Sequence, residues 1–451
     1  MKMTKSQTNT KLALLAGATA LAALAPQAHA QSSDALIDKL VDKGILTVSE
    51  AKDLREESDK DFKTAFQAKT GMPDWVTAYK ISGDVRGRFE DINSDTHAQN
   101  TRDRFRYRLR AGLTISLQND LEAGFRLTSD EPAKGNTTGG DPISGNTTMT
   151  GNATKKFIYI DQVYGKWSPL HADGWDGNVT FGKMENPFVA SDIVFDPDYT
   201  PEGAALQLGY AFNDKQSVRF NGGGFVLNEL SGSSYDSYMF GSQIRWDAKW
   251  TPKLATSLGV SYFDLMNSAN LTTSAVPDSN AGNWRDGSGK LVTGFNPWVV
   301  DAAITYTLDS FPLYNGAFPI KLAGDVVNNL SASDKQNNAW SAGVTFGKSG
   351  KKGLWEISYR YKYLEANSWY EELVDSDFGA FYGAYYHNSP GSLGYATGTN
   401  IKGHAFKLVY SVTDSLSLGA TYFLTELIDH PVSPYKNSDT GRLQVDASLK
   451  F

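Results

Sequence analysis

The C-terminal segment alternates strictly between apolar and polar residues, and this alternation is the strongest constraint that the sequence places on the fold. The apolar residues are Leu443, Val445, Ala447, Leu449 and Phe451, and the polar residues are Arg442, Gln444, Asp446, Ser448 and Lys450. A strand with this period of two has one apolar and one charged face. The same pattern recurs along most of the chain, which predicts a closed β-barrel with lipid outside and water inside.

The first thirty residues have the features of a secretory signal peptide. Three lysines precede an apolar run from Leu12 to Ala25, and Ala28-His29-Ala30 is a small-x-small cleavage site. That run is too short to cross a bilayer, and no later run reaches the roughly 18 apolar residues that a transmembrane helix needs. We therefore expect residues 1–30 to be removed on export, and we exclude a helical membrane protein.

Residues 31–74 have a helical pattern and are predicted to form a short periplasmic segment. Leu36, Ile37 and Leu40 have the spacing of one helix face, and Thr47 with Glu50 forms a capping box for a second helix. The apolar stripe of this segment needs a partner. Packing against the barrel or itself, self-association near an oligomer axis and a role as a plug all remain open.

Residues 75–451 are predicted to form the barrel, an all-β fold of sixteen antiparallel strands. The candidate strands centre near 79–90, 102–117, 120–129, 155–168, 176–184, 203–212, 215–227, 236–250, 253–265, 296–308, 318–329, 338–348, 353–364, 401–411, 415–426 and 439–451. Links after even-numbered strands are mostly tight, whereas links after odd-numbered strands include 130–154, 185–202, 266–295 and 365–400. Short turns at one rim and long loops at the other are typical of outer-membrane barrels. The strand from Phe157 to Trp167 fits neither an even-outward nor an odd-outward alternation throughout, which indicates a bulge or a misplaced boundary.

A row of arginines identifies the wet face of the second strand. Phe105, Leu109 and Leu113 share the opposite face. A guanidinium costs about 2–4 kcal/mol at the lipid midplane, so the arginines must face the lumen. The predicted positive wall of the pore consists of Arg86, Arg88, Arg104, Arg106, Arg108, Arg110 and Arg126. A structural network in which these arginines pair with Glu90, Glu122 and loop acids is the alternative, and it does not exclude a solute path.

The link 185–202 is rich in acids and prolines, and we predict that it carries the opposite charge in the pore. Its acidic residues are Glu185, Asp192, Asp196, Asp198 and Glu202. If this loop folds inward, acids facing arginines would set a transverse field that favours charged or dipolar solutes. An external cap with solvated acids is the alternative for the loop. A calcium site formed by Asp192, Asp196 and Asp198 is a third reading, because Ca²⁺ prefers carboxylate oxygens.

Composition and missing motifs exclude several other functions. The chain has no cysteine, so neither disulfides nor thiolate metal sites can contribute, and its net charge of −7 argues against a nucleic-acid partner. No nucleophile elbow, metal-spaced histidine cluster or phosphate loop occurs. We therefore predict no catalytic residues, no metal site and no cofactor.

Several motifs resemble the putative porin family of bacterial outer-membrane β-barrels. They are the segment Gly182-Lys183-Met184-Glu185-Asn186-Pro187-Phe188, the segment Val194-Phe195-Asp196-Pro197-Asp198, and the two first strands around Arg86 and Arg104. The resemblance covers nearly the whole mature chain. It implies a diffusion pore in the outer membrane, assembled as a homotrimer, with the acidic link folded into the lumen. It implies no particular solute.

The sequence therefore predicts an outer-membrane porin for passive diffusion of small hydrophilic solutes and ions. The alternative function is a receptor or adhesin that binds a ligand such as a glycan with its long loops. For that alternative, the aromatic pairs Trp369-Tyr370, Phe381-Tyr382 and Tyr385-Tyr386 would stack on sugars.

Overall fold

The computed structural model describes residues 72–94, 101–133, 139–276, 281–332, 336–379, 398–429 and 439–451. The strands are β1 (Val76–Ser94), β2 (Arg102–Leu117), β3 (Leu121–Asp130), β4 (Thr147–Thr148), β5 (Phe157–Leu170), β6 (Trp175–Lys183), β7 (Glu202–Asn213), β8 (Gln216–Asn228), β9 (Ser237–Lys249), β10 (Leu254–Met266), β11 (Pro297–Leu308), β12 (Phe318–Asn329), β13 (Asn338–Gly347), β14 (Trp355–Leu364), β15 (Ile401–Ser411), β16 (Leu416–Leu427) and β17 (Thr440–Lys450). A single 3₁₀ turn, η1 (Ser268–Asn270), is the helical element in this described part.

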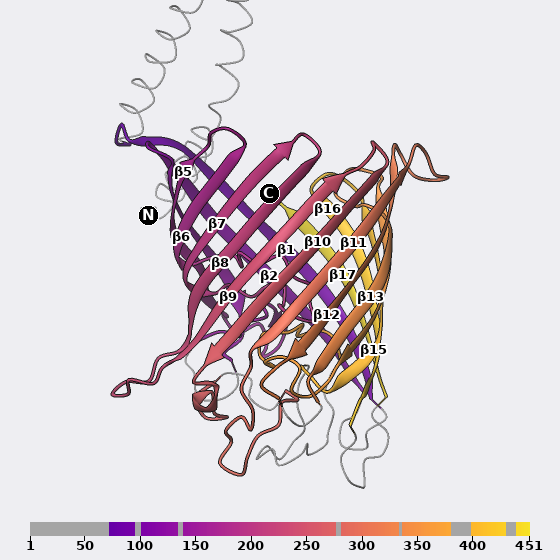
Figure 1. Cartoon of the computed structure of the whole chain (residues 1–451). Coiled ribbons are helices and arrows are strands. Elements are labelled where there is room, and N and C mark those ends of the chain that lie inside the picture. The colour runs from indigo at the N-terminus through magenta and orange to yellow at the C-terminus, as the bar shows by residue number, and fades with distance from the viewer. Residues whose placement is uncertain are drawn as a thin grey trace, which may run out of the picture. The chain divides into compact units, whose positions relative to one another are not determined.

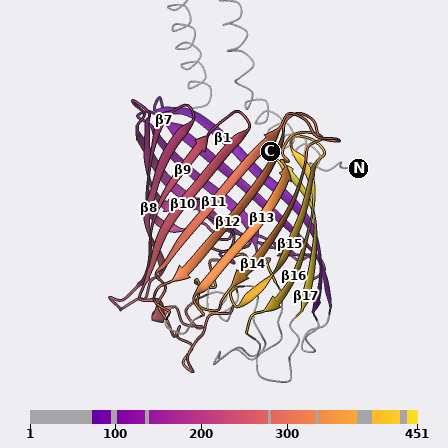
Figure 2. The ribbon, with the colours of Figure 1, turned by 45° about the vertical axis from the view of Figure 1, so that its right-hand side comes forward.

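Sixteen of these strands form one closed antiparallel barrel, as the sequence predicted (Figure 1). Each strand pairs with its neighbour in the chain, and β17 returns to β1 to close the sheet, with Phe89 opposite Val445. The very short β4 lies in the link after β3 and pairs with the outer end of β2. Closure leaves no sheet edge, so the backbone polar groups of the wall find partners within the protein. Figure 2 shows the tilted strands from a second side.

The two rims of the barrel differ in the length of their connections. One rim carries the tight turns and the C-terminus, and the opposite rim carries the long links, as Figure 1 shows. The three-residue link 118–120 between β2 and β3 has Asn119 and Asp120 at φ values of 62° and 60°, a left-handed conformation that Asn and Asp tolerate in tight turns. By the rule for bacterial outer-membrane barrels, the short-turn rim is periplasmic and the long-loop rim is external.

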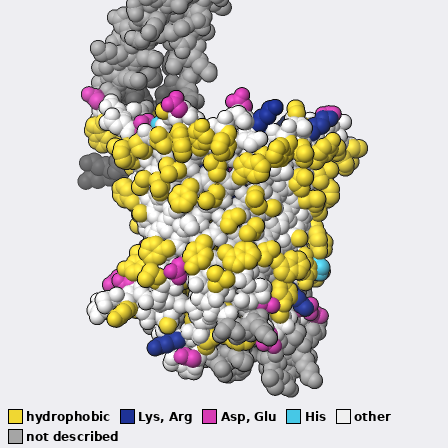
Figure 3. Space-filling view, viewed as in Figure 1, with side chains coloured by type: hydrophobic (Ala, Val, Ile, Leu, Met, Phe, Trp, Pro, Cys, Tyr) yellow, Lys and Arg dark blue, Asp and Glu magenta, His cyan; other side chains and the backbone are white. Residues whose placement is uncertain are grey.

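The outer surface of the barrel is apolar. Phe105 and Leu109 on β2 point outward and are exposed, whereas Arg106 and Arg108 between them are buried inside. Figure 3 shows hydrophobic side chains over the wall in view, with charged side chains gathered mainly at the two rims. The predicted assignment of the arginine face to the lumen is therefore confirmed for β2.

Strand β5 contains the bulge that its sequence indicated. Arg126 of β3 pairs with Gln162, but the next residue, Leu127, pairs with Ile160, so Asp161 is an extra residue in β5. Ile160 before the bulge and Val163 after it are both exposed on the outside. The extra residue therefore switches the outward positions from even to odd numbers, which explains why the strand fits neither phase.

The largest cluster of buried apolar residues lies among the external loops and the inner wall of the barrel. It joins loop residues such as Phe195 and Trp369 to inward-facing wall residues such as Phe225 and Phe263. A sixteen-strand barrel is too wide for its own wall side chains to fill. Here, folded loops occupy part of the lumen.

The N-terminal predictions cannot be compared with the fold. The expected signal peptide 1–30 and nearly all of the expected helical segment 31–74 lie outside the described residues. Within the part that is described, no helix has the length and hydropathy needed to cross a bilayer.

Candidate pore constriction

Residues 184–201 connect β6 to β7 and leave the barrel wall well below its outer rim; we call them the inner loop. Lys183, the last residue of β6, pairs with Val163, whereas β5 continues outward to Phe157. Six further residues of strand correspond to about 20 Å of wall. The inner loop therefore begins at mid-depth in the barrel, from where its side chains reach the lumen.

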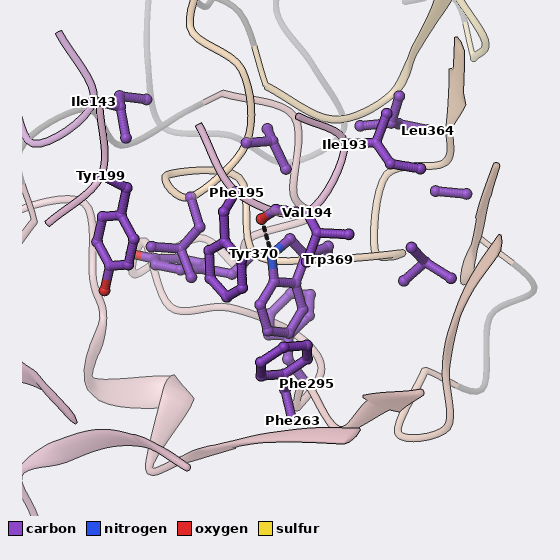
Figure 4. Packing of buried hydrophobic residues seen from close by; sticks show 14 of the residues in the cluster. Ile143, Ile193, Val194, Phe195, Tyr199, Phe263, Phe295, Leu364, Trp369 and Tyr370 are labelled. Atoms are coloured by element: carbon purple, nitrogen blue, oxygen red, sulfur yellow. Dashed lines mark hydrogen bonds between the residues drawn. The ribbon is translucent and has the colours of Figure 1, made fainter. Parts of the chain in front are cut away.

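Aromatic side chains fix the inner loop against the opposite side of the barrel. Phe188 meets Phe263 of β10 edge to face at 5.0 Å between ring centroids. Phe195 also packs on Phe263 and stacks on Tyr199 within the loop itself. Figure 4 shows the rings of Phe195, Tyr199 and Phe263 within one packed group. Each such ring removes apolar surface from water, so the loop is held on the β8–β10 side.

A second loop, which sequence reasoning did not place in the lumen, packs on the inner loop. Residues 365–379, the described part of the link after β14, form this companion loop. Trp369 donates its indole N–H to the carbonyl of Val194 at 2.7 Å, drawn as a dashed line in Figure 4. The amide of Asp196 donates to the carbonyl of Leu373 at 2.7 Å. The apolar run around Trp369 and Leu373 is unusual for a solvated loop and was the available signal of burial.

The companion loop also bears on the receptor alternative. Trp369 and Tyr370 are almost completely buried. Their rings therefore belong to the packed core and present no surface for stacking on a sugar. The other two aromatic pairs named for that function, 381–382 and 385–386, lie outside the described residues.

One buried lysine on the barrel wall holds both loops. Lys362 of β14 donates to Asp192 of the inner loop at 2.6 Å and to Asp375 of the companion loop at 2.7 Å. Burial would raise the pKa of Asp192, but the ammonium group of Lys362 outweighs it and holds this pKa below its ordinary value. For Asp375, burial dominates and raises the pKa despite the same lysine.

Asp196 lies between the two loops in an acidic environment. Its carboxylate accepts hydrogen bonds from the amides of Ser376, at 2.9 Å, and Asp198, at 2.8 Å. Burial, followed by the nearby charges of Asp375 and Asp198, raises the pKa of Asp196 well above its ordinary value. The carboxyl group is therefore neutral over a wider pH range than an exposed aspartate.

The predicted arginine wall divides into two groups by its partners. The outer group contacts acids of the wall and of the companion loop: Arg88 pairs with Asp446 and Asp377, and Arg104 pairs with Glu90. Arg106 lies 3.7 Å from Glu90 and donates to the carbonyl of Asn146.

A further arginine, Arg442 of β17, was not among the predicted wall arginines. It forms ion pairs with both Glu90 and Asp377. This part of the wall is a nearly neutral ionic network.

The inner group contacts the acidic inner loop. Arg108 and Arg110 both pair with Asp84 of β1 and with Asp198, at 2.7–3.0 Å. Asp198 thus touches the arginine wall directly. Nε of Arg126 pairs with Asp161, the bulge residue. Nη1 of Arg126 lies 3.4 Å from the carboxylate of Glu185.

The two remaining predicted residues occupy separate places. Arg86 donates to the side chain of Asn146 at 2.6 Å. Glu202 pairs with Lys183 at 3.1 Å, at the junction of β6 and β7. Asp192, Asp196 and Asp198 each bind different protein donors, and no group of three His, Cys, Asp or Glu in the described ranges could hold a metal ion. The described structure therefore gives no support to the predicted calcium site at Asp192, Asp196 and Asp198.

Three overlapping cavities follow the inner face of β2 and β3 from the outer side toward the periplasm. The outer cavity, of about 300 Å³, is bordered by Arg108, Arg110 and Asp198. The middle cavity, of about 390 Å³, shares Arg110 with it and adds Arg126 and Glu185. The third, of about 330 Å³, shares Arg126 and Glu185 with the middle one and reaches toward the periplasmic ends of the strands. We call this series of cavities the corridor.

A closed sixteen-strand barrel with an apolar exterior, long external loops and a charged interior defines the class of bacterial outer-membrane porins. Among solved structures, OprB of Pseudomonas putida at high pH is similar, with 13% identity, a TM-score of 0.51, and coverage of 83% of this chain and 94% of that chain. The outer membrane channel DcaP of Acinetobacter baumannii has 12% identity and a TM-score of 0.42, covering 83% and 97% of the two chains.

Residues 92–287 match the profile of the family described as "Putative porin", the family that the motifs resemble. A search of curated proteins found no match. The family match and the fold both support an outer-membrane β-barrel.

Proposed function

We propose that the chain provides passive diffusion of small hydrophilic solutes and ions through the corridor. The observation that supports this most directly is the series of cavities bordered by ionic side chains, between the arginine wall and the inner loop. At the level of the inner loop, packed apolar side chains fill the β8–β10 side of the lumen, so the proposed path at that depth runs along β2 and β3.

The constriction lies, in this proposal, at the middle cavity. Glu185 extends from the inner loop with 77% of its side chain exposed, and Arg126 faces it from the wall. These opposite charges, 3.4 Å apart at the border of the cavity, set a local field in the cavity, which is little screened because few mobile ions fit there. Solutes with a charge or a strong dipole orient in this field and pass, whereas apolar solutes gain nothing from it.

The decisive experiment is reconstitution of the purified barrel in planar lipid bilayers. We expect stepwise increases of current on insertion. If three barrels associate, as we also propose from the family, each insertion event should show three equal levels. A correctly inserted but electrically silent barrel would overturn the diffusion function and favour a receptor, and single levels only would overturn the trimer.

A further inference from the structure

The middle cavity of the corridor combines two kinds of wall, and this combination carries an inference about the solute. Arg110 and Arg126 border it from the barrel wall; the inner loop contributes the charged group of Glu185 and the apolar edges of Phe188, Phe195 and Tyr199. A volume of about 390 Å³ is within the range of small-ligand sites. Resting on the proposed diffusion path, we infer that this cavity is a transient binding site for zwitterionic solutes with an apolar body, such as apolar amino acids.

The charges in the cavity favour a solute that carries both signs. Arg110 is paired with Asp84 and Asp198, and Arg126 with Asp161. Because these carboxylates already compensate the guanidinium charges, a solute anion meets little net positive charge. The exposed carboxylate of Glu185 disfavours a lone anion and can bind an ammonium group. Unused N–H groups of the arginines can receive a carboxylate at the same time.

The apolar side of the cavity favours a hydrocarbon body over a sugar ring. Phe188 and Phe195 are 6% and 5% exposed, so they present edges and no open ring face for stacking. Tyr199 stacks on Phe195, and within the described residues its hydroxyl makes no hydrogen bond. An aliphatic or aromatic side chain can cover these edges and the neighbouring Ala190 and Pro197, which gains apolar contact without displacing the rings.

The test is interruption of ion current through single channels by four probes of similar size. L-Phenylalanine carries both charges, 3-phenylpropionate lacks the ammonium group, phenethylamine lacks the carboxylate, and glucose is a neutral polyol. We expect L-phenylalanine to interrupt the current at concentrations roughly 5- to 10-fold lower than each of the other three, because two charge-assisted contacts act together. Equal or stronger interruption by glucose or by either single-charge probe would overturn the inference.

A variant and its matched control connect the effect to the cavity. Glu185→Gln removes the negative pole with little risk to folding, since that side chain is mostly exposed. It should weaken the interruption of current by L-phenylalanine roughly 5- to 10-fold. Interruption by 3-phenylpropionate, which has no ammonium group, should not become weaker. Glu426→Gln makes the same chemical change at an exposed pair with Lys402 and should behave as the parent chain. If Glu185→Gln leaves interruption by L-phenylalanine unchanged, the inference is wrong, although ion conduction would still support the diffusion path. A parent chain that conducts no current would overturn both proposals.

Discussion

At the scale of single residues, the arginines of the wall have unequal roles because their partners differ. Arg104 pairs with Glu90 and does not border any of the three cavities, whereas Arg126 borders two of them. Arg126→Gln removes a positive charge from the corridor and leaves Asp161 and Glu185 uncompensated. We expect the permeability ratio of cations to anions to rise roughly twofold, measured as a reversal potential in a salt gradient.

Arg104→Gln is the matched comparison for that variant. It makes the same change on the same wall but outside the corridor, so its reversal potential should stay close to that of the parent chain. Equal shifts in the two variants would mean that the whole wall, and not the corridor, determines charge preference.

Asp196 gives the loops a defined pH dependence. Its folded-state pKa is raised by burial and by Asp375 and Asp198. A raised folded pKa means that its contribution to stability is fully present below the ordinary carboxyl range and is lost as the pH rises through the raised value. We expect current noise and conductance to increase with rising pH as the ionised carboxylate repels its neighbours. Noise spectra recorded across a pH series measure this.

Asp196→Asn cannot ionise and should remove that pH-dependent transition. Asp286→Asn is a suitable control, because hydrogen bonds from Ser288 and Lys290 lower the pKa of this exposed aspartate. The assignment fails if the transition persists in Asp196→Asn or disappears in the control.

Sequence reasoning succeeded for residue orientation but could not specify which acid each arginine contacts. Alternation alone placed Arg106 and Arg108 inside, because lipid penalises a guanidinium whatever the rest of the fold. It could not show that Asp198 would touch Arg108, since this contact depends on where the inner loop leaves the wall. Nor could it place Asp161, whose inward position follows from the bulge.

At the scale of elements, the two loops in the lumen depend on one side chain of β14. Lys362 binds Asp192 and Asp375, and its own side chain is 2% exposed. Lys362→Met keeps the length of the side chain but leaves two partly buried carboxylates without their cation. Removing one member of a buried ionic group costs about 3–5 kcal/mol, so we expect the loops to separate. Higher conductance and faster proteolysis within 365–379 would show this.

The exposed pair of Lys402 and Glu426 provides the control for that variant. Lys402→Met removes a cation from a partly exposed ion pair and should cost at most about 1 kcal/mol, with unchanged conductance. If Lys362→Met behaved in the same way, the aromatic packing around Trp369 would be sufficient to hold the loops.

The strands were predictable as elements, but the companion loop was not. Strand positions follow from a local period of two, and tight turns such as Asn119-Asp120 confirm their spacing. The burial of Trp369 depends on its contact with Val194, which is 175 residues away in the chain. A local pattern contains no information about such a partner, so it cannot distinguish an aromatic pair that stabilises a loop from one that binds a ligand.

At the scale of the whole molecule, closure is what makes the chain a membrane protein. The sixteen strands and their order were predictable, because adjacent strands in the chain are adjacent in the sheet. How much of the lumen remains open was not predictable. It is the difference between the width of the barrel and the volume of the folded loops, and that volume depends on contacts between distant segments.

The seam between β1 and β17 offers a direct test of closure. Gly83 and Phe451 exchange two backbone hydrogen bonds of 2.9 and 3.1 Å. Hydrogen-bonded and non-hydrogen-bonded pairs alternate along an antiparallel ladder, so Phe89 and Val445 also form a hydrogen-bonded pair and the amide of Val445 points across the seam. Val445→Pro removes that donor and leaves a carbonyl unpaired at membrane depth, at a cost of roughly 3 kcal/mol or more. We expect loss of the compact, detergent-resistant form seen before boiling on a denaturing gel. Val445→Thr keeps the N–H at the same site and should retain that form; its loss in both variants would mean that the apolar side chain, and not the seam hydrogen bond, is responsible.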